Sequence, residues 1–140
     1  MKEHKSVFIE TLGCPKNYID SAVMAHYLRG SGWKLVEHPN QAEMIIVNTC
    51  GFIEDAKTES IEAIWNYIRA REDGKIEYLL VTGCLAERYS EVLKNEMPQV
   101  DIVFGNRDQS KIIHALERAR NSSSKPFVST PRDYLTNWYE

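Results

Sequence analysis

The feature that most constrains the fold is the regular alternation of short apolar runs with amphipathic helical stretches along the 140 residues. Runs such as "EMIIVNT" (43–49) and "IEYLLVT" (76–82) are almost continuously apolar, which is typical of strands covered on both faces. Between them, Ile61, Ile64 and Ile68 follow the i, i+3, i+7 spacing of an amphipathic helix. The alternation predicts a parallel sheet with helices on both faces.

Strands and helices alternate along the chain except at one place, where two strands follow each other. Strands are expected at 6–12, 33–37, 43–49, 76–82 and 100–105, and helices at 18–29, 53–71, 86–97 and 107–120, the last capped by Asp108. This order predicts a three-layer α-β-α fold around a mainly parallel five-stranded sheet, with the flavodoxin-like strand order 2-1-3-4-5. The connection "HPNQAE" after strand two is short for a parallel crossover. Antiparallel pairing of strand two is therefore the alternative.

Composition and charge limit the class of protein. We expect one domain over residues 1–120, followed by a Ser-, Thr- and Pro-rich linker or extension over 121–140. A net charge of −3 gives no electrostatic footprint for nucleic acid or for an anionic membrane. The apolar runs are too short to span a bilayer, and "MKEHKS" lacks the apolar core of a signal peptide. These features predict a cytoplasmic protein.

The three cysteines occupy equivalent places in this pattern. Cys14, Cys50 and Cys84 each follow a predicted strand, in the sequences "TLGCPK", "VNTCGF" and "VTGCLA". Because the carboxyl ends of parallel strands lie along one edge, the three thiols are expected to share that edge. An odd number of widely spaced cysteines favours a reducing compartment over a disulfide scaffold. The thiols are then free for metal binding or catalysis.

The predicted strand order makes the three cysteine-bearing strands neighbours. At a strand spacing of about 4.8 Å their ends span roughly 10 Å. This distance fits an iron–sulfur cluster held by several thiolates and is larger than a single zinc ion requires. Helix N-termini face the same edge, and their partial positive charge favours thiolates and an anionic cluster. The interpretation requires that no thiol be sealed in the interior, where a free cysteine acts as a small apolar residue.

Residues beside the cysteines are candidates for a supporting shell: Gly13, Gly51, Gly83, Asn17, Asn48 and Thr49. The glycines would let the backbone turn or approach closely. The polar side chains would supply the hydrogen bonds that tune the potential of a cluster.

Two other classes of function remain open at this point. A cysteine-nucleophile enzyme would need a histidine base, and the candidates His26, His38 and His114 share no predicted strand end with a cysteine. A receiver-like binding module would need acidic residues at the strand ends for Mg²⁺, where thiols and amides stand instead. The histidines are interpreted as surface residues, and Tyr67 as a packing residue.

Three stretches, "TLGCPKNYIDS", "VNTCGFIEDAKTESIEAI" and "VTGCLAERY", resemble the N-terminal domain of the radical-SAM methylthiotransferases. The resemblance covers residues 6–118. In that family this domain binds an auxiliary 4Fe–4S cluster through three cysteines. The matching positions here are Cys14, Cys50 and Cys84, so the resemblance implies that these three residues are the metal ligands.

Two branches of the family differ after the first two cysteines. The tRNA-modifying branch, which acts on an adenosine next to the anticodon, typically shows Cys-Gln-Met-Asn first and a serine-containing sequence second. Here the corresponding sequences are "CPKN" (14–17) and "CGFI" (50–53), which look like the RimO branch. That branch uses S-adenosylmethionine to add a methylthio group to the β-carbon of an aspartate in small-subunit ribosomal protein number twelve. The tRNA branch is kept as the alternative.

The resemblance also implies parts that the chain lacks. The family's radical-SAM domain binds a second 4Fe–4S cluster and S-adenosylmethionine through CxxxCxxC, and a TRAM domain follows, whereas no cysteine follows Cys84 here. We expect a domain fragment, inactive alone, whose partners are those two domains and the ribosomal protein substrate. Three thiolates would leave one iron of the auxiliary cluster open for sulfide or methylsulfide. A radical on the aspartate carbon would take up that sulfur.

Overall fold

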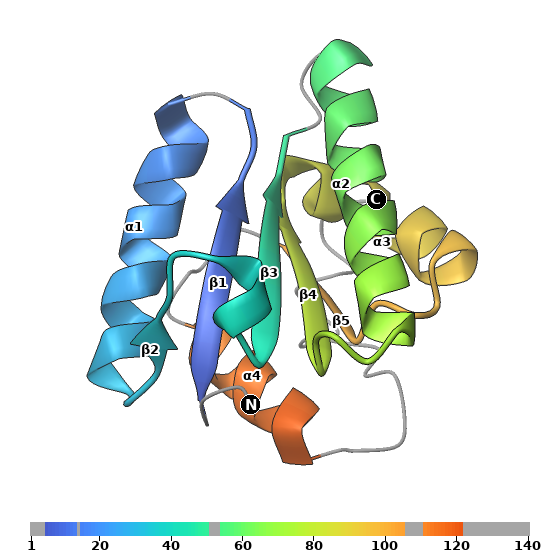
Figure 1. Ribbon diagram of the computed structural model, residues 1–140. Helices are drawn as coiled ribbons and strands as arrows, with labels where there is room; N and C mark the ends of the chain where they lie inside the picture. The colour runs from blue at the N-terminus through green and yellow to red at the C-terminus, as the bar shows by residue number, and fades with distance from the viewer. Residues whose placement is uncertain (1–4, 14, 51–53, 106–110, 122–140) are drawn as a thin grey trace.

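The computed structural model describes residues 5–13, 15–50, 54–105 and 111–121 (Figure 1). The elements follow in the order β1 (Ser6–Thr11), α1 (Pro15–Gly30), β2 (Lys34–Leu35), η1 (Pro39–Gln41), β3 (Met44–Thr49), α2 (Glu54–Glu72), β4 (Tyr78–Gly83), α3 (Cys84–Glu96), β5 (Ile102–Phe104) and α4 (Ile112–Asn121). No helix in these four ranges is long and apolar enough to cross a membrane.

The five strands form one parallel sheet in the order β2-β1-β3-β4-β5, which confirms the predicted topology. Strand β2 pairs with β1 in parallel, with Val7 opposite Leu35, so the antiparallel alternative is wrong. The short connection suffices because β2 has only two residues and the 3₁₀ turn η1 leads directly to β3. The chain is fixed there by the Glu43 amide, which donates to the Ser6 carbonyl at 3.1 Å.

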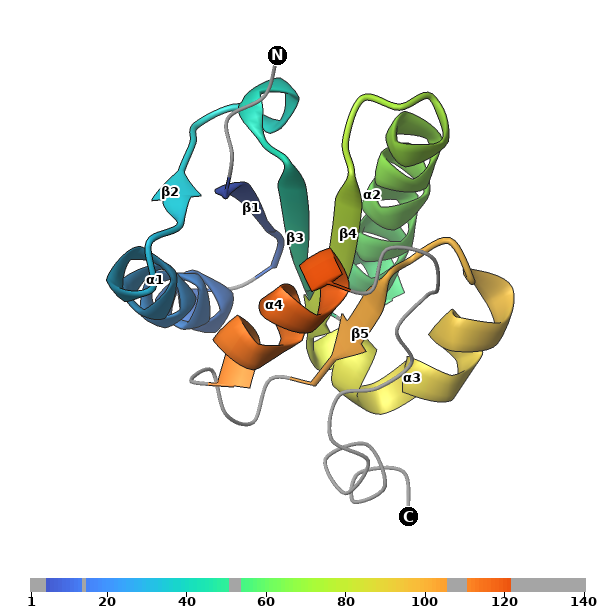
Figure 2. The same cartoon turned by 90° about the horizontal axis from the view of Figure 1, so that it is seen from below.

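Helices cover both faces of the sheet and confirm the three-layer architecture. Figure 2 shows α1 and α4 on one face and α2 and α3 on the other. Every residue of β3 is buried, and its side chains alternate between two apolar clusters. Ile45 and Val47 pack toward α2 and α3, whereas Met44 and Ile46 pack toward α1 and α4. The carboxyl end of β3 therefore lies at the centre of the sheet edge.

Some element bounds differ from the prediction. Helix α1 begins at Pro15 rather than at residue 18, because proline is well suited to the first turn of a helix. Helix α3 begins at Cys84 itself rather than at residue 86, without a side-chain cap. The predicted cap Asp108 and the extension 122–140 lie outside the described residues.

Candidate functional site

The strand register brings the cysteine-bearing turns to one edge of the sheet, the upper edge in Figure 1. Thr49 of β3 lies opposite Gly83 of β4, so Cys50 and Cys84 each follow one member of a paired position. On the other side of β3, the Leu12 amide donates to the Asn48 carbonyl at 3.0 Å and extends the pairing of β1 past its last residue. The predicted common edge is thus present for Cys50 and Cys84. Cys14 lies outside the described residues.

The end of β3 is held from α2. The Cys50 amide donates to Ser60 Oγ at 2.9 Å, and the same hydroxyl donates to the Cys50 carbonyl at 3.0 Å. One buried side chain therefore satisfies both backbone groups of Cys50 and fixes its position. Ser60 is not among the residues predicted from the sequence. Its signal is its position, since Ser60, Ile64 and Ile68 share the apolar face of α2 at i, i+4 and i+8 spacing.

The Gly13 backbone lies directly against the Cys50 side chain. A Cβ atom at Gly13 would come within 2.4 Å of Cys50 Cβ and 2.7 Å of Cys50 Sγ, and Gly13 has φ +97°. Only glycine fits both the contact and the backbone conformation. The predicted close approach at Gly13 is confirmed. It also leaves Cys50 only 4% exposed, whereas the sequence analysis expected an open thiol.

The end of β4 is built differently. Gly83, with φ +98°, leads straight into α3, so that Cys84 is the first residue of the helix. A Cβ atom at Gly83 would lie 2.4 Å from the Thr49 carbonyl oxygen and 2.5 Å from its nitrogen, so the close approach expected here is also confirmed. Cys84 is partly exposed. The partial positive charge of the α3 N-terminus favours a thiolate at this position.

Asn17 and Asn48 form a buried polar link between α1 and β3. The Asn17 side-chain amide donates to the Thr49 carbonyl at 2.7 Å. The Asn48 side-chain amide donates to the Asn17 carbonyl and to Ser21 Oγ, each at 2.9 Å. Both asparagines are at most 1% exposed. These groups position the backbone around the strand end. Their role beside a cluster stays a prediction.

Thr49 joins β3 to the start of α3. Its hydroxyl donates to the Thr82 carbonyl at 2.6 Å and accepts from the Leu85 amide at 3.2 Å and the Ala86 amide at 3.4 Å. The amides in the first turn of a helix have no partner within the helix. Thr49 therefore caps α3 from the neighbouring strand, which explains how that helix begins without a capping residue of its own.

The three histidines proposed as alternative bases, His26, His38 and His114, are all exposed, as expected of surface residues. Within the described ranges, no group of three or more histidine, cysteine and acidic side chains is placed to hold a metal ion. The proposed ligand set includes Cys14, which those ranges do not cover. The donor chemistry fits an iron–sulfur cluster: two thiols follow paired strand positions, and one of them begins a helix.

Comparison with known proteins gives consistent results. Residues 6–105 match the model of the Uncharacterized protein family UPF0004. Proteins named ribosomal protein uS12 methylthiotransferase RimO are similar: that of Anaeromyxobacter sp. (strain K) is 46% identical over 90% of this chain and 28% of its own length. Those of Aquifex aeolicus and Clostridioides difficile (strain 630) are 44% and 46% identical over 90% and 76% of this chain.

The chain spans only about a quarter of the length of these relatives, 28% for the first and 24% for that of Clostridioides difficile. The matched region nevertheless contains all three cysteine motifs and the whole sheet, and it confirms the resemblance to the N-terminal region of the RimO methylthiotransferases. The chain belongs to the protein family UPF0004.

Proposed function

We propose that this chain is the cluster-binding, sulfur-donating domain of a RimO-type methylthiotransferase, with Cys14, Cys50 and Cys84 as the ligands of an auxiliary 4Fe–4S cluster. One observation carries the proposal. Gly13 packs against Cys50, and Thr49 pairs with Gly83, so the residues that precede the three cysteines in sequence meet around the end of β3. When bound, a cluster with three protein thiolates supplies one iron with an open position for the sulfur to be transferred.

Different residues at this edge of the sheet would support different parts of the cluster site. Ser60 fixes the backbone of Cys50, and Thr49 holds the first turn of α3 in place behind Cys84. The α3 N-terminus stabilises negative charge at this edge, which both thiolates and an anionic cluster carry. Because Gly13 covers Cys50, ligation requires the Gly13 segment and the Cys50 side chain to move apart. We expect this movement to limit the rate of cluster loading.

The reaction itself belongs to a longer protein, since the chain spans only 28% and 24% of the length of two of these relatives. There we propose that this domain donates sulfur to an aspartate of a ribosomal protein, as the names of the relatives suggest. A radical-SAM domain with the second cluster and S-adenosylmethionine, and a TRAM domain, would be its partners. The cytoplasm is the proposed location, because a reducing compartment keeps the three thiols free.

Anaerobic reconstitution with iron and sulfide tests the proposal on this chain alone. We expect about four irons and four sulfides per chain, the composition of a 4Fe–4S cluster, with the absorbance of such a cluster. Cys14→Ser, Cys50→Ser and Cys84→Ser should each lower the iron content severalfold. A Ser90→Ala variant serves as a control, since Ser90 is a buried residue of α3 that is not one of the proposed ligands. Unchanged iron content in all three cysteine variants would refute the assignment.

A further inference from the structure

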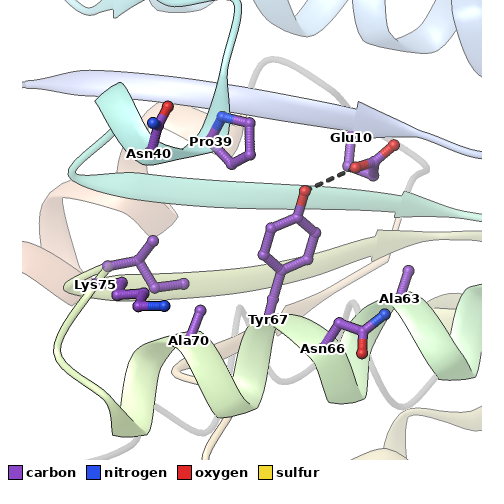
Figure 3. A pocket seen from close by; sticks show the side chains of 9 residues that line it. Glu10, Pro39, Asn40, Ala63, Asn66, Tyr67, Ala70 and Lys75 are labelled. Atoms are coloured by element: carbon purple, nitrogen blue, oxygen red, sulfur yellow. Dashed lines mark hydrogen bonds between the residues drawn. The ribbon is translucent and has the colours of Figure 1, made fainter.

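A cavity lies on the α2 side of the sheet, away from the cysteines. Its volume is about 360 Å³, which is within the range of small-ligand sites. The lining comes from β1, η1, α2 and the approach to β4: Glu10, Pro39, Asn40, Ala63, Asn66, Tyr67, Ala70, Lys75 and Ile76. Figure 3 shows α2 presenting the small side chains of Ala63 and Ala70 to this space, on either side of Tyr67. The cavity exists because alanine stands where a larger residue would fill it.

Glu10 puts a carboxylate where the fold would normally place an apolar side chain. Two residues earlier, Phe8 packs in the apolar cluster beneath α2, and alternate residues of a strand share a face. Glu10 is partly buried on an inner strand of the sheet. Among the described residues, the only hydrogen bond to its carboxylate comes from the Tyr67 hydroxyl, at 2.7 Å, and no ion pair neutralises this charge. A partly desolvated carboxylate without a cation is costly.

Tyr67 holds one oxygen of this carboxylate in place. Burial raises the pKa of Tyr67 well above its usual value, and the hydrogen bond to Glu10 and the charge of Glu10 raise it further. The phenol therefore stays protonated and donates to one carboxylate oxygen. The second oxygen has no hydrogen bond within the described part of the chain. The Tyr67 ring forms a wall of the cavity, and an aromatic ring attracts a nearby cation.

The two ends of the cavity carry opposite charges. Figure 3 places Glu10 at one end and Lys75 at the other, with Ala70 and Tyr67 between them. Lys75 is exposed, and no ion pair involving it is found in the described ranges. A ligand that fits would carry a cation at one end, an apolar stem in the middle and a hydrogen-bond acceptor at the other end.

We propose that this cavity binds a guanidinium or primary ammonium group on an apolar stem, with the cation at Glu10 and a carbonyl or carboxylate group toward Lys75. Arginine and lysine have this chemistry, either as free amino acids or as side chains of a peptide. The proposal is independent of the cysteines and of any cluster. It assigns Glu10 a binding role beyond that of fastening Tyr67 to β1.

Titration of the ¹⁵N-labelled, metal-free chain by NMR tests this inference. The probes are L-arginine, L-citrulline, which is the uncharged analogue of arginine, and the capped peptides Ala-Ala-Arg-Ala-Ala and Ala-Ala-Gln-Ala-Ala. We expect arginine or the arginine peptide to shift the amide signals around Glu10, Ala63 and Ala70. Their affinity should exceed that of citrulline or of the glutamine peptide at least tenfold. A tighter peptide identifies a polypeptide source, and a tighter free amino acid identifies a metabolite.

Three variants separate binding from structure. Glu10→Gln keeps an acceptor for Tyr67 but removes the charge, and should weaken arginine binding at least tenfold with the spectrum otherwise preserved. Ala63→Leu fills the cavity without changing the charge and should abolish binding. Glu62→Gln removes an exposed charge from the same helix and should leave the affinity unchanged. Equal binding of arginine and citrulline, no binding of either charged probe, or full binding by Glu10→Gln would overturn the inference.

Discussion

The ends of β3 and β4 carry the same sequence pattern, an apolar strand followed by a small residue and a cysteine, yet they differ in construction. Cys50 at the end of β3 is 4% exposed and is held by Ser60. Cys84 at the end of β4 is partly exposed and begins a helix. One motif thus produces a protected thiol and an accessible thiol on neighbouring strands. We infer that Cys50 is the fixed position of the site and Cys84 its open one.

The difference arises from where two glycines pack. Gly13 follows β1 and lies on the Cys50 side chain, and Gly83 is the last residue of β4 and lies on the Thr49 backbone. Both contacts converge on the last residues of β3, because β3 lies between β1 and β4 in the sheet. The end of the central strand is therefore enclosed, whereas Cys84, which follows β4, stays partly exposed. Substitutions at Gly13 and at Gly83 therefore test the difference between the two strand ends.

The largest effect is expected from Gly83→Ala. The new Cβ would overlap the Thr49 backbone, which cannot move without disrupting the sheet, and φ +98° with ψ −169° is a conformation that is essentially limited to glycine. Strain and overpacking together should lower the free energy of unfolding by about 4 kcal/mol. Urea unfolding followed by circular dichroism measures it.

Gly74→Ala is the matched control for Gly83→Ala. Gly74 also has a positive φ, +79°, but nothing lies within 4 Å of its Cβ position, so only backbone strain of about 1–2 kcal/mol is expected. Similar losses in the two variants would mean that the contact with Thr49 contributes nothing.

Gly13→Ala should have the next largest effect, about 3 kcal/mol from strain and overlap with Cys50. Gly13 is exposed, so its segment can yield more than the interior Gly83 turn. The movement should uncover Cys50, and its alkylation rate should rise as stability falls. A destabilised variant in which Cys50 reacts no faster would show that Gly13 is not what covers the thiol.

The positions of the strand ends could be predicted from the sequence, because each strand ends where its apolar run ends. The parallel topology then brings those ends to one edge of the sheet. Their unequal exposure could not, because it depends on which neighbour each glycine packs against, and these contacts join residues far apart in the chain. The start of α3 was predicted two residues late for a related reason. The residue directly before Cys84 is glycine rather than Ser, Thr, Asp or Asn, so no capping side chain marks the helix start. The capping hydroxyl comes from Thr49 on another strand.

The contacts of the polar residues near the cysteines could not be predicted from the sequence either. Asn17, Asn48 and Thr49 stand close to cysteines in sequence, but each binds backbone groups of another element, which the sequence does not indicate. Glu10 also has a signal in the sequence. The strand "SVFIETL" places this charged residue on the same face as the apolar residue Phe8. A charge at such a position indicates either an ion pair or a site, and only the three-dimensional neighbours distinguish the two.

Ser60→Ala tests how firmly Cys50 is held. The substitution leaves a buried amide and a buried carbonyl without their hydrogen bonds, and should lower the free energy of unfolding by about 2 kcal/mol. Ser90 provides the control, because its hydroxyl is buried and without a partner in the described part of the chain, so Ser90→Ala should be neutral or slightly stabilising. Equal losses in the two variants would mean that the bonds from Ser60 to Cys50 do not stabilise the strand end.

The smallest expected effect compares the two thiols directly. In the folded, metal-free chain, iodoacetamide should modify Cys84 about tenfold faster than Cys50, equivalent to about 1.4 kcal/mol, because Cys50 reacts only when its cover opens. Mass spectrometry of the two peptides after a short pulse measures both rates in one sample. In 8 M urea the two rates should become nearly equal. This control shows that the local sequences around the two cysteines do not themselves differ in reactivity. If Cys50 reacts as fast as Cys84 in the folded chain, the contrast between a protected and an accessible thiol does not exist in solution. The slow loading step proposed for the cluster would then lose its physical basis.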